Sequence, residues 1–375
     1  MTPDASSPTP ERQPLCEAQR IVVKLGTAVL TDQGATLERG FMHDFAALVS
    51  EAMDEQRQVI IVSSGSVAAG VEALGMTRRP TDVSEQQAAA ASGQPRLMAR
   101  WSEAFDVRGR RVAQILVGRG DFDSRQRYLN IRNCVAALLE RGVVPIVNEN
   151  DTVATEEISL GDNDVLAAKL AVAVAADALV ILTTAPGVLD GDDRVVTEAS
   201  TTQQLAGLVR REKSRQGRGG MGTKVEAARI ASLSGIPTVI APGRPAHNLA
   251  EILAGMPLGT HVHGARARHA ARRLWISMSA TPAGAIEIDE GAAAAITRRG
   301  ASLLAKGVRG VTGRFEVGDV LLIRDHQGRE IGRGLTNLSA DELRQVVGRD
   351  SHEFAGILGR QAHEEVIHRD NLAMT

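Results

Sequence analysis

The residues best suited to chemistry lie in short segments at the ends of apolar runs. Lys24-Leu25-Gly26-Thr27 and Ser63-Ser64-Gly65-Ser66 both stand at the end of such a run. Ligands of open α/β sheets bind where the carboxyl ends of strands open into loops. A lysine beside a glycine suits a phosphate there, and small hydroxyl groups before a helix can bind an anion. The alternatives are a lysine paired with a carboxylate and a plain serine helix cap.

Two more segments combine carboxylates with amides. They are Asn148-Glu149-Asn150-Asp151 and Gly161-Asp162-Asn163-Asp164, each flanked by apolar residues. Such oxygens can accept hydrogen bonds from an ammonium group, orient lysines or hold hydrated Mg²⁺. The spacing of an EF-hand loop is absent. Two ordinary Asx turns are the alternative, but two such segments in one α/β chain favour a function.

A glycine-rich segment at 217–224 runs into a helical pattern. It satisfies G-x-G-x-x-G, but a charged stretch precedes it, and Thr223-Lys224 reverses the order found in a P-loop. Glycine backbone N–H groups, a helix start and the Lys224 point charge together suit a polyphosphate. The alternative is a surface loop without a ligand.

The elements that must position these segments alternate between apolar strands and helical patterns. Strands are expected at 20–25, 58–62, 112–117, 143–147, 178–182 and 238–240, and helices at 38–55, 84–107, 131–141, 164–175, 224–234 and 248–254. Strands rich in Val and Ile that alternate with helices are typical of a parallel sheet covered on both faces. The sequence therefore predicts an α/β fold, a three-layer αβα sandwich with a mainly parallel sheet.

The pattern changes near residue 260, where short β-like runs replace the long alternation. Strands are expected at 275–278, 284–288, 318–324 and 330–334, with helices at 292–299 and 341–347. We therefore predict a second, small β-rich domain. The full expected order is a disordered leader at 1–19, a main domain at 20–262, a linker at 263–273, the small domain at 274–358 and a tail at 359–375.

Composition narrows the class of protein. The 375 residues carry a net charge of −2, with 43% hydrophobic and 23% charged residues, which argues against a protein held mainly by charge to nucleic acid or membrane. No apolar run approaches the roughly 20 residues of a membrane span. Two cysteines at no metal or redox spacing favour reduced thiols in the cytoplasm. His261, His263 and His269 are expected in a solvated linker rather than at a metal.

Taken together, the segments resemble a known family. VVKLGT (22–27), SSGSVAAG (63–70), NENDTVAT (148–155), GDND (161–164) and GGMGTK (219–224) are similar to the motifs of the glutamate 5-kinase family, which belongs to the amino-acid-kinase superfamily. Residues 289–323 resemble a PUA domain. The resemblance spans about 20–358 and implies ATP-dependent phosphorylation of the side-chain carboxylate of L-glutamate to L-glutamyl 5-phosphate, the first step of proline biosynthesis.

The resemblance also implies roles for individual residues. The catalytic set would be Lys24 and Lys224, which contact the ATP phosphates, with Asp164 positioning both lysines. Glutamate would be bound by Ser64, Asp151 and Asn163. The nucleotide site would contain Lys24, Thr183, Thr184, Arg218, Gly219, Gly220, Met221, Gly222, Thr223 and Lys224. Mg²⁺ would accompany ATP, and no metal-ligating residue of the protein is predicted.

This chain departs from the family pattern mainly around the nucleoside. The family has Thr-Asp where Thr183-Thr184 stands, a Tyr and a Pro within the loop at 188–192, a small residue at Arg218 and often Lys at Ser159. The resemblance further implies a dimer or tetramer and feedback inhibition by proline. RNA binding is not expected, because the small domain has nearly balanced charge and few aromatic residues. A kinase of N-acetylglutamate, aspartate or a nucleotide monophosphate, and a non-catalytic RNA-binding regulator, are the alternatives.

Overall fold

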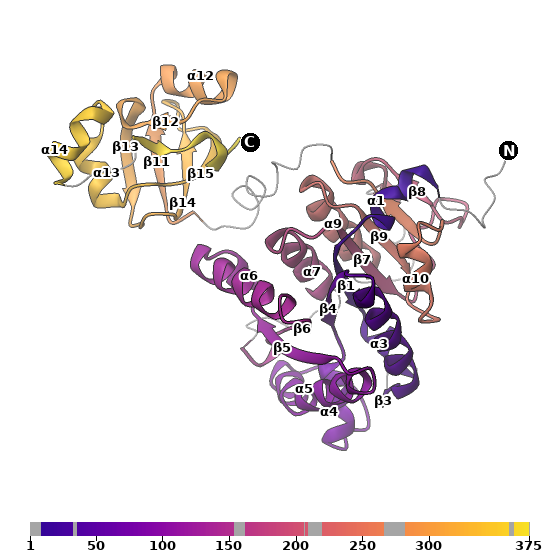
Figure 1. The fold of residues 1–375 in the computed structure, drawn as a ribbon. Helices are drawn as coiled ribbons and strands as arrows, with labels where there is room; N and C mark the ends of the chain where they lie inside the picture. The colour runs from indigo at the N-terminus through magenta and orange to yellow at the C-terminus, as the bar shows by residue number, and fades with distance from the viewer. Residues whose placement is uncertain are drawn as a thin grey trace. The chain divides into compact units, whose positions relative to one another are not determined.

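The computed structural model describes residues 9–32, 36–153, 162–205, 207–208, 220–265, 282–359 and 364–374. The chain divides into two compact units (Figure 1). The first contains Met1–Arg119 and Leu129–Arg268, and the second contains Gly120–Tyr128 and His269–Thr375. Each unit is described by itself below. No described helix is long and apolar enough to cross a membrane.

The first unit is built on an eight-stranded sheet with the order β5-β6-β4-β1-β7-β9-β10-β8. Its strands are β1 Arg20–Leu25, β4 Gln58–Ser63, β5 Arg111–Val117, β6 Val143–Glu149, β7 Ala178–Thr183, β8 Glu198–Ala199, β9 Thr238–Pro242 and β10 Thr260–Val262. Every neighbouring pair is parallel except β9 with β10. The expected mainly parallel sheet is confirmed, with one antiparallel step near its edge. A hairpin of β2 Thr31–Asp32 and β3 Thr36–Leu37 lies outside this sheet.

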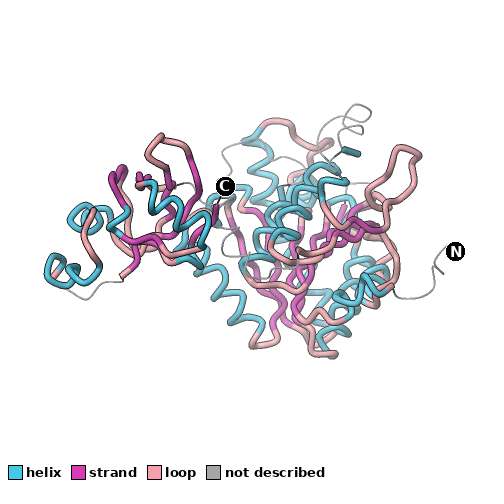
Figure 2. Tube along the Cα trace, turned by 90° about the horizontal axis from the view of Figure 1, so that it is seen from above, coloured by secondary structure: helices cyan, strands magenta, loops and turns pink. Residues whose placement is uncertain are grey.

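Helices cover both faces of the sheet (Figure 2). The helices of this unit are α1 Gln13–Cys16, α2 Thr27–Leu30, α3 Arg39–Asp54, α4 Ser66–Ala73, α5 Val83–Asp106, α7 Asp162–Ala173, α9 Gly220–Leu233 and α10 Asn248–Leu253, and α6 Arg125–Leu139 begins in the stretch Gly120–Tyr128 that belongs to the second unit. Figure 1 shows α3 and α10 on one side of the central strands and α7 and α9 on the other. This is the predicted three-layer arrangement.

Strand alternation decides which side chains of β1 reach which helix layer. Ile21, Val23 and Leu25 belong to the core that also contains side chains of α3, α5 and α10. Successive side chains of a strand point to opposite faces. Val22 and Lys24 therefore face the layer of α7 and α9, which places the Lys24 side chain toward Asp164.

The prediction of a disordered leader at 1–19 is wrong for its second half. A 3-10 helix at Pro10–Arg12 leads into α1. Leu15 and Ala18 are buried, and Arg12 is completely buried. The guanidinium of Arg12 donates to the backbone oxygens of Met256, Leu258 and Thr197 at 2.7–2.8 Å. The proline-rich composition gave no sign of these helices, because the contacts that hold the segment in place are with residues far away in the sequence.

The second unit contains a five-stranded sheet with the order β13-β11-β14-β15-β17. Its elements are β11 Gly284–Ile288, α12 Glu290–Arg299, β12 Leu303–Leu304, β13 Val308–Gly313, β14 Val320–Arg324, β15 Glu330–Leu335, α13 Ala340–Val346, α14 Phe354–Leu358, β16 Glu365–Ile367 and β17 Leu372–Met374. The stretch predicted as a tail thus supplies two strands, since β17 pairs with β15 and β16 with β12. The strand predicted at 275–278 and most of the predicted linker lie outside the described residues.

Candidate active site

One buried carboxylate holds two lysines. Lys24 Nζ lies 2.6 Å from Asp164 Oδ1, and Lys224 Nζ donates to Asp164 Oδ2 at 3.0 Å. The hydroxyl of Thr223 donates to the same Oδ2 at 2.8 Å. Asp164 is fully buried, while Lys24 is 4% and Lys224 8% exposed. The structure therefore brings together the three residues that the sequence analysis assigned to catalysis.

Three elements meet at this carboxylate. Lys24 is the penultimate residue of β1, Asp164 lies in the first turn of α7, and Lys224 lies in the second turn of α9. The start of a helix stabilises a carboxylate, because the first backbone N–H groups and the macrodipole are positive there. In Figure 1, β1, α7 and α9 lie close together. The site thus sits at the carboxyl end of a central strand, where open α/β sheets bind ligands.

The glycine-rich segment differs from the expected loop before a helix. Helix α9 begins at Gly220, so residues 220–223 form its first turn instead of a loop. Lys224 Nζ also donates to the Gly220 carbonyl oxygen at 3.0 Å. The first backbone N–H groups of the helix have no partner within it and can bind anions beside the Lys224 ammonium. Arg218 and Gly219 lie outside the described residues.

The electrostatics of the cluster favour an anionic ligand. Burial by itself raises the pKa of Asp164, but the charges of Lys24 and Lys224 outweigh this, so that the pKa lies below its ordinary value. Burial lowers the pKa of Lys24, and the nearby charge of Lys224 lowers it further. The carboxylate of Asp164 raises it again, but only in part. Two basic side chains thus face one acidic side chain in this cluster. The excess positive charge is buried and suits a phosphate group.

The residues predicted to bind the amino acid form a second polar group. The Asn163 side-chain amide donates to Ser64 Oγ at 2.9 Å and to Asn148 Oδ1 at 3.0 Å. Asp151, which is buried, accepts a 3.0 Å hydrogen bond from the Ser66 hydroxyl. Asn163 Oδ1 is buried and accepts no hydrogen bond among the described residues. Because Asn163 directly precedes Asp164, this group adjoins the lysine cluster.

Several residues that hold this group in place were missed by the sequence analysis. Gln94 accepts from the side chain of Asn148 at 2.9 Å, and the buried Trp101 indole donates to Ser63 Oγ at 2.9 Å. Both come from α5, which packs closely on α4. A Cβ built on Gly93 would stand 1.8 Å from the Ser66 carbonyl oxygen, so only glycine permits this approach. The available signal for this approach was Gly93, a glycine inside the helical pattern at 84–107.

The remaining residues predicted for the nucleotide site are partly placed. Thr183 ends β7, the strand that pairs with β1, and its carbonyl oxygen accepts from Gly243 N at 2.7 Å. Thr184 follows at the exposed surface, and Met221 and Gly222 are half-buried in the first turn of α9. Thr183 and Thr184 thus lie at the carboxyl end of β7, beside the carboxyl end of β1 that carries Lys24. No described contact assigns them to a base or ribose.

The lysine cluster offers Mg²⁺ no free carboxylate. Both oxygens of Asp164 lie within 3.0 Å of an ammonium group. Mg²⁺ prefers oxygen ligands and keeps several waters beside the phosphates of its substrate. The described residues at this point therefore do not fit as direct ligands, and any Mg²⁺ would depend on nucleotide oxygens and water.

A separate polar cluster lies at the far edge of the sheet. Glu198 Oε2 is 2.8 Å from His261 Nδ1 and 3.0 Å from His263 Nε2, while Arg12 Nε donates to Glu198 Oε1 at 2.7 Å. His261 is buried, so the expectation of histidines in a solvated linker is wrong for this residue. Burial raises the pKa of Glu198, but hydrogen bonds from His261 and Arg12 outweigh this and lower it to about 2. His269 lies outside the described residues.

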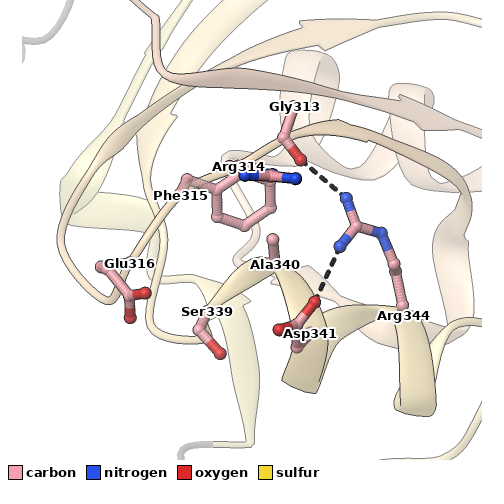
Figure 3. Close-up of a pocket in the computed structure, with 8 residues that line it drawn as sticks. All are labelled: Gly313, Arg314, Phe315, Glu316, Ser339, Ala340, Asp341 and Arg344. Carbon is pink, nitrogen blue, oxygen red and sulfur yellow. Dashed lines mark hydrogen bonds and ion pairs between the residues drawn. The ribbon is translucent and has the colours of Figure 1, made fainter.

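The second unit has a pocket of about 790 Å³ between the end of β13 and the start of α13 (Figure 3). Arg344 donates to the Gly313 carbonyl oxygen at 2.6 Å and to Asp341 at 2.9 Å. The other lining residues are Arg314, Phe315, Glu316, Ser339 and Ala340. Ser339 and Glu342 form a capping box at the start of α13. The capping box therefore already satisfies two backbone N–H groups at this helix start.

Comparison with known proteins agrees with the two-unit organisation. The model of the amino acid kinase family matches residues 19–242, and that of the PUA domain matches residues 284–358. The chain is 42% identical over 368 residues to a glutamate 5-kinase of Thermus thermophilus, covering 96% of this chain and 99% of the relative. It is 43% identical over 370 residues to a glutamate 5-kinase of Pseudomonas syringae pv. syringae, covering 97% and 100%.

A third relative extends this agreement. The glutamate 5-kinase of Citrobacter koseri is 38% identical over 365 residues, which cover 96% of this chain and 99% of the relative. Matches of this length include both units and the polar segments at the end of β1 and the starts of α7 and α9. The chain therefore belongs to the amino acid kinase family, among the glutamate 5-kinases, and carries a PUA domain after its kinase domain.

Proposed function

We propose that this protein transfers the γ-phosphoryl group of ATP to the side-chain carboxylate of L-glutamate, giving L-glutamyl 5-phosphate and ADP. The observation that carries the proposal is the pair of buried lysines held by Asp164 beside the polar group of Ser64, Asp151 and Asn163. This reaction begins proline biosynthesis.

The reaction requires the neutralisation of negative charge more than it requires proton transfer. The side-chain carboxylate of glutamate has a reference pKa near 4.3, so it is already ionised at pH 7. One of its oxygens attacks the γ-phosphorus in line, a new carboxyl–phosphorus bond forms, and the bond from phosphorus to the β,γ-bridging oxygen breaks as ADP leaves. No proton must be removed from the nucleophile. The barrier comes from bringing one anion against another.

The two lysines lower that barrier. Lys24 and Lys224 supply positive charge from opposite sides of Asp164, and the first turn of α9 adds backbone N–H donors. Fixed charges in a site that excludes water stabilise the charge of the transition state without reorganisation. Asp164 has no role as a base, because its pKa is lowered and both oxygens contact cations. It acts as a positioning residue that keeps both ammonium groups in place.

Recognition of the amino acid falls to the second polar group. Its α-ammonium would donate to Asp151 and to Asn163 Oδ1, a buried acceptor that has no hydrogen-bond partner among the described residues. Helix α4 has Gly65 as its N-cap and receives no side-chain cap. Its first backbone N–H groups beside Ser64 are therefore suited to the α-carboxylate. Such a site selects a free amino acid over an N-acylated one, because acylation removes the positive charge.

Several further features belong to the same proposal. Mg²⁺ would accompany ATP and neutralise its phosphates, without a direct carboxylate ligand at the lysine cluster. The resemblance to the family supports a dimer or tetramer and inhibition by proline. Two free cysteines, with Cys134 exposed, support a reducing compartment such as the cytoplasm.

The second unit is proposed not to bind RNA. Several basic side chains of this unit are paired with acidic neighbours within it, which reduces the positive charge available to phosphates. The described pairs are Arg127–Asp121, Lys306–Asp350, Arg309–Asp289, Arg329–Asp325, Arg333–Glu330 and Arg344–Asp341. RNA binding requires an unpaired basic surface and stacking aromatic side chains.

The test is ATP consumption measured with L-glutamate, N-acetylglutamate and aspartate, with hydroxylamine present to trap an acyl phosphate as the hydroxamate. We expect hydroxamate formation with L-glutamate and at most a few per cent of that rate with N-acetylglutamate. Faster turnover with N-acetylglutamate or aspartate would instead support another kinase of the same family. A chain that consumes no ATP with any acid, although folded, would contradict the proposed activity.

A further inference from the structure

The cluster at the far edge of the sheet has the composition of a transition-metal site. Two imidazoles and one carboxylate, from His261, His263 and Glu198, place one ligand atom each within 4.8 Å of the others. Imidazole nitrogens suit Zn²⁺ and its neighbours in the periodic table, whereas Mg²⁺ requires oxygen. The kinase reaction uses none of these residues, since Lys24 and Lys224 meet on other strands and helices.

Strand geometry explains why the three side chains converge. Strands β8 and β10 are parallel, and Glu198 is the register partner of His261. His263 follows two positions later, so its side chain lies on the same face as that of His261. The two imidazole rings have centroids 4.8 Å apart. Glu198, as the cross-strand neighbour of His261, and His263, two positions after it, therefore lie on one face, and the three side chains present their donor atoms to one point.

The carboxylate is already fixed by a second contact. Arg12 Nε donates to Glu198 Oε1 at 2.7 Å, which leaves Oε2 facing the two histidines. Residues around metal ligands commonly orient them in this way. Arg12 is itself held by the backbone oxygens of Met256 and Leu258. The donor set is thus anchored on β8, β10 and the N-terminal 3-10 helix.

The distances from the carboxylate oxygen to both imidazole nitrogens are close to those between the ligands of one ion. Glu198 Oε2 lies 2.8 and 3.0 Å from the two imidazole nitrogens. Atoms bound to one tetrahedral Zn²⁺ at about 2.0–2.1 Å lie roughly 3.3 Å apart. The carboxylate oxygen must therefore recede by a few tenths of an ångström, and the two imidazole nitrogens, which lie within 4.8 Å of each other, must take the same spacing. The side chains of Glu198 and His263 are about one-third exposed, so an ion can enter and a water can complete its coordination.

We propose that Glu198, His261 and His263 bind a divalent transition-metal ion of the Zn²⁺ class, with water as the fourth ligand. The ion would join β8 to β10 at the sheet edge and, through Glu198, hold the N-terminal segment that Arg12 inserts there. This site is independent of the phosphoryl-transfer site and would be structural.

The test uses the full chain without a histidine tag and with Cys134→Ser, because an exposed thiol also binds Zn²⁺. The protein is stripped with EDTA, dialysed free of it and titrated with Zn²⁺ in millimolar Mg²⁺, with calorimetry for stoichiometry. Co²⁺ is then used as a spectroscopic probe of geometry. We expect about one Zn²⁺ per chain and the intense visible absorption of tetrahedral Co²⁺.

Two variants separate the proposed site from adventitious binding. His263→Asn removes a ligand, and we expect Zn²⁺ affinity to fall at least about tenfold. His247→Asn is the matched control, because His247 is exposed and lies 3.7 Å from Glu251 on one helical turn. It should bind as the parent does. No bound Zn²⁺ in the parent, or equal affinity in both variants, would overturn the proposal. The parent titration decides the matter even if His263→Asn does not fold.

Discussion

Lys224 and Asp164 are 60 positions apart in the chain, yet the Lys224 ammonium donates to Asp164 Oδ2 at 3.0 Å while Oδ1 of the same carboxylate faces Lys24. One acidic side chain thus fixes two cations from different elements. Removing it would leave two buried positive charges uncompensated, which is strongly unfavourable. The arrangement is both a structural tie and a means of presenting positive charge to phosphate.

Removal of either lysine is expected to affect the chemical step. For Lys24→Ala or Lys224→Ala, we predict a loss of kcat of about 100- to 1000-fold, because each removes a fixed charge from the transition state. Steady-state kinetics with L-glutamate and ATP measure this. Lys306→Ala is the control, since Lys306 is an exposed residue of the second unit paired with Asp350. Near-normal turnover in the first two variants would refute the assigned roles.

Asp151 is expected to govern affinity for glutamate instead. Asp151→Asn keeps the size of the side chain but removes the charge that would meet the α-ammonium. We predict a KM for glutamate raised by about 10- to 100-fold, with a smaller change in kcat, because a hydrogen bond between charged groups contributes about 1.5–3 kcal/mol. The KM for ATP should be almost unchanged. A fall in kcat with an unaltered glutamate KM would place Asp151 elsewhere in the mechanism.

The pH dependence of activity should report Lys24. Its pKa lies below the ordinary 10.5, because burial disfavours the charged form. We therefore expect kcat/KM for ATP, which reports groups of the free enzyme, to decline at a pH below 10.5. In Lys24→Arg the residual activity should lose this decline, because arginine stays protonated. An alkaline limb that is identical in both proteins would exclude Lys24 as its origin.

The same shift has a defined sign for stability. Since the pKa of Lys24 is lower in the folded than in the unfolded chain, the unfolded chain binds more protons between that lowered pKa and 10.5. The contribution of Lys24 to the free energy of unfolding therefore becomes more favourable as pH rises through this window. Urea unfolding of the parent and of Lys24→Met at several alkaline pH values measures the difference in slope.

Close contact between α4 and α5 gives a prediction for stability. Gly93→Ala would place a methyl group 1.8 Å from the Ser66 carbonyl oxygen, so one helix must move. We expect a loss of at least about 3 kcal/mol, at the upper end for overpacked sites, and a raised glutamate KM because Ser66 supports Asp151. Urea unfolding and kinetics measure both effects.

Gly40→Ala is the matched control for this substitution. Gly40 lies in α3, and a Cβ there meets no atom within 4 Å. We expect no loss and a gain of up to about 1 kcal/mol, because alanine favours helices. Equal stability of Gly40→Ala and Gly93→Ala would show that the helices adjust without cost.

The sequence alone determined the local helices and strands, and it determined that the site lies at the carboxyl ends of the strands. Val- and Ile-rich runs marked β1, β4 and β7 within one residue, and the polar segments after them indicated a ligand site. These features depend on neighbours within a few positions, so periodicity and spacing record them. The grouping of Lys24, Asp164 and Lys224 came from the family resemblance, not from the pattern.

Only the tertiary structure decided which distant groups meet. The local sequence around Arg12 indicates a polar leader, yet the partners of its guanidinium lie more than 180 positions away. The contact between Glu198 and His261 depends on the register of β8 against β10. Helix α9 also begins at Gly220, earlier than its pattern indicated, and Thr223 in its first turn donates to Asp164, 59 positions away. Contacts of this kind arise from packing and register, and no local propensity encodes them.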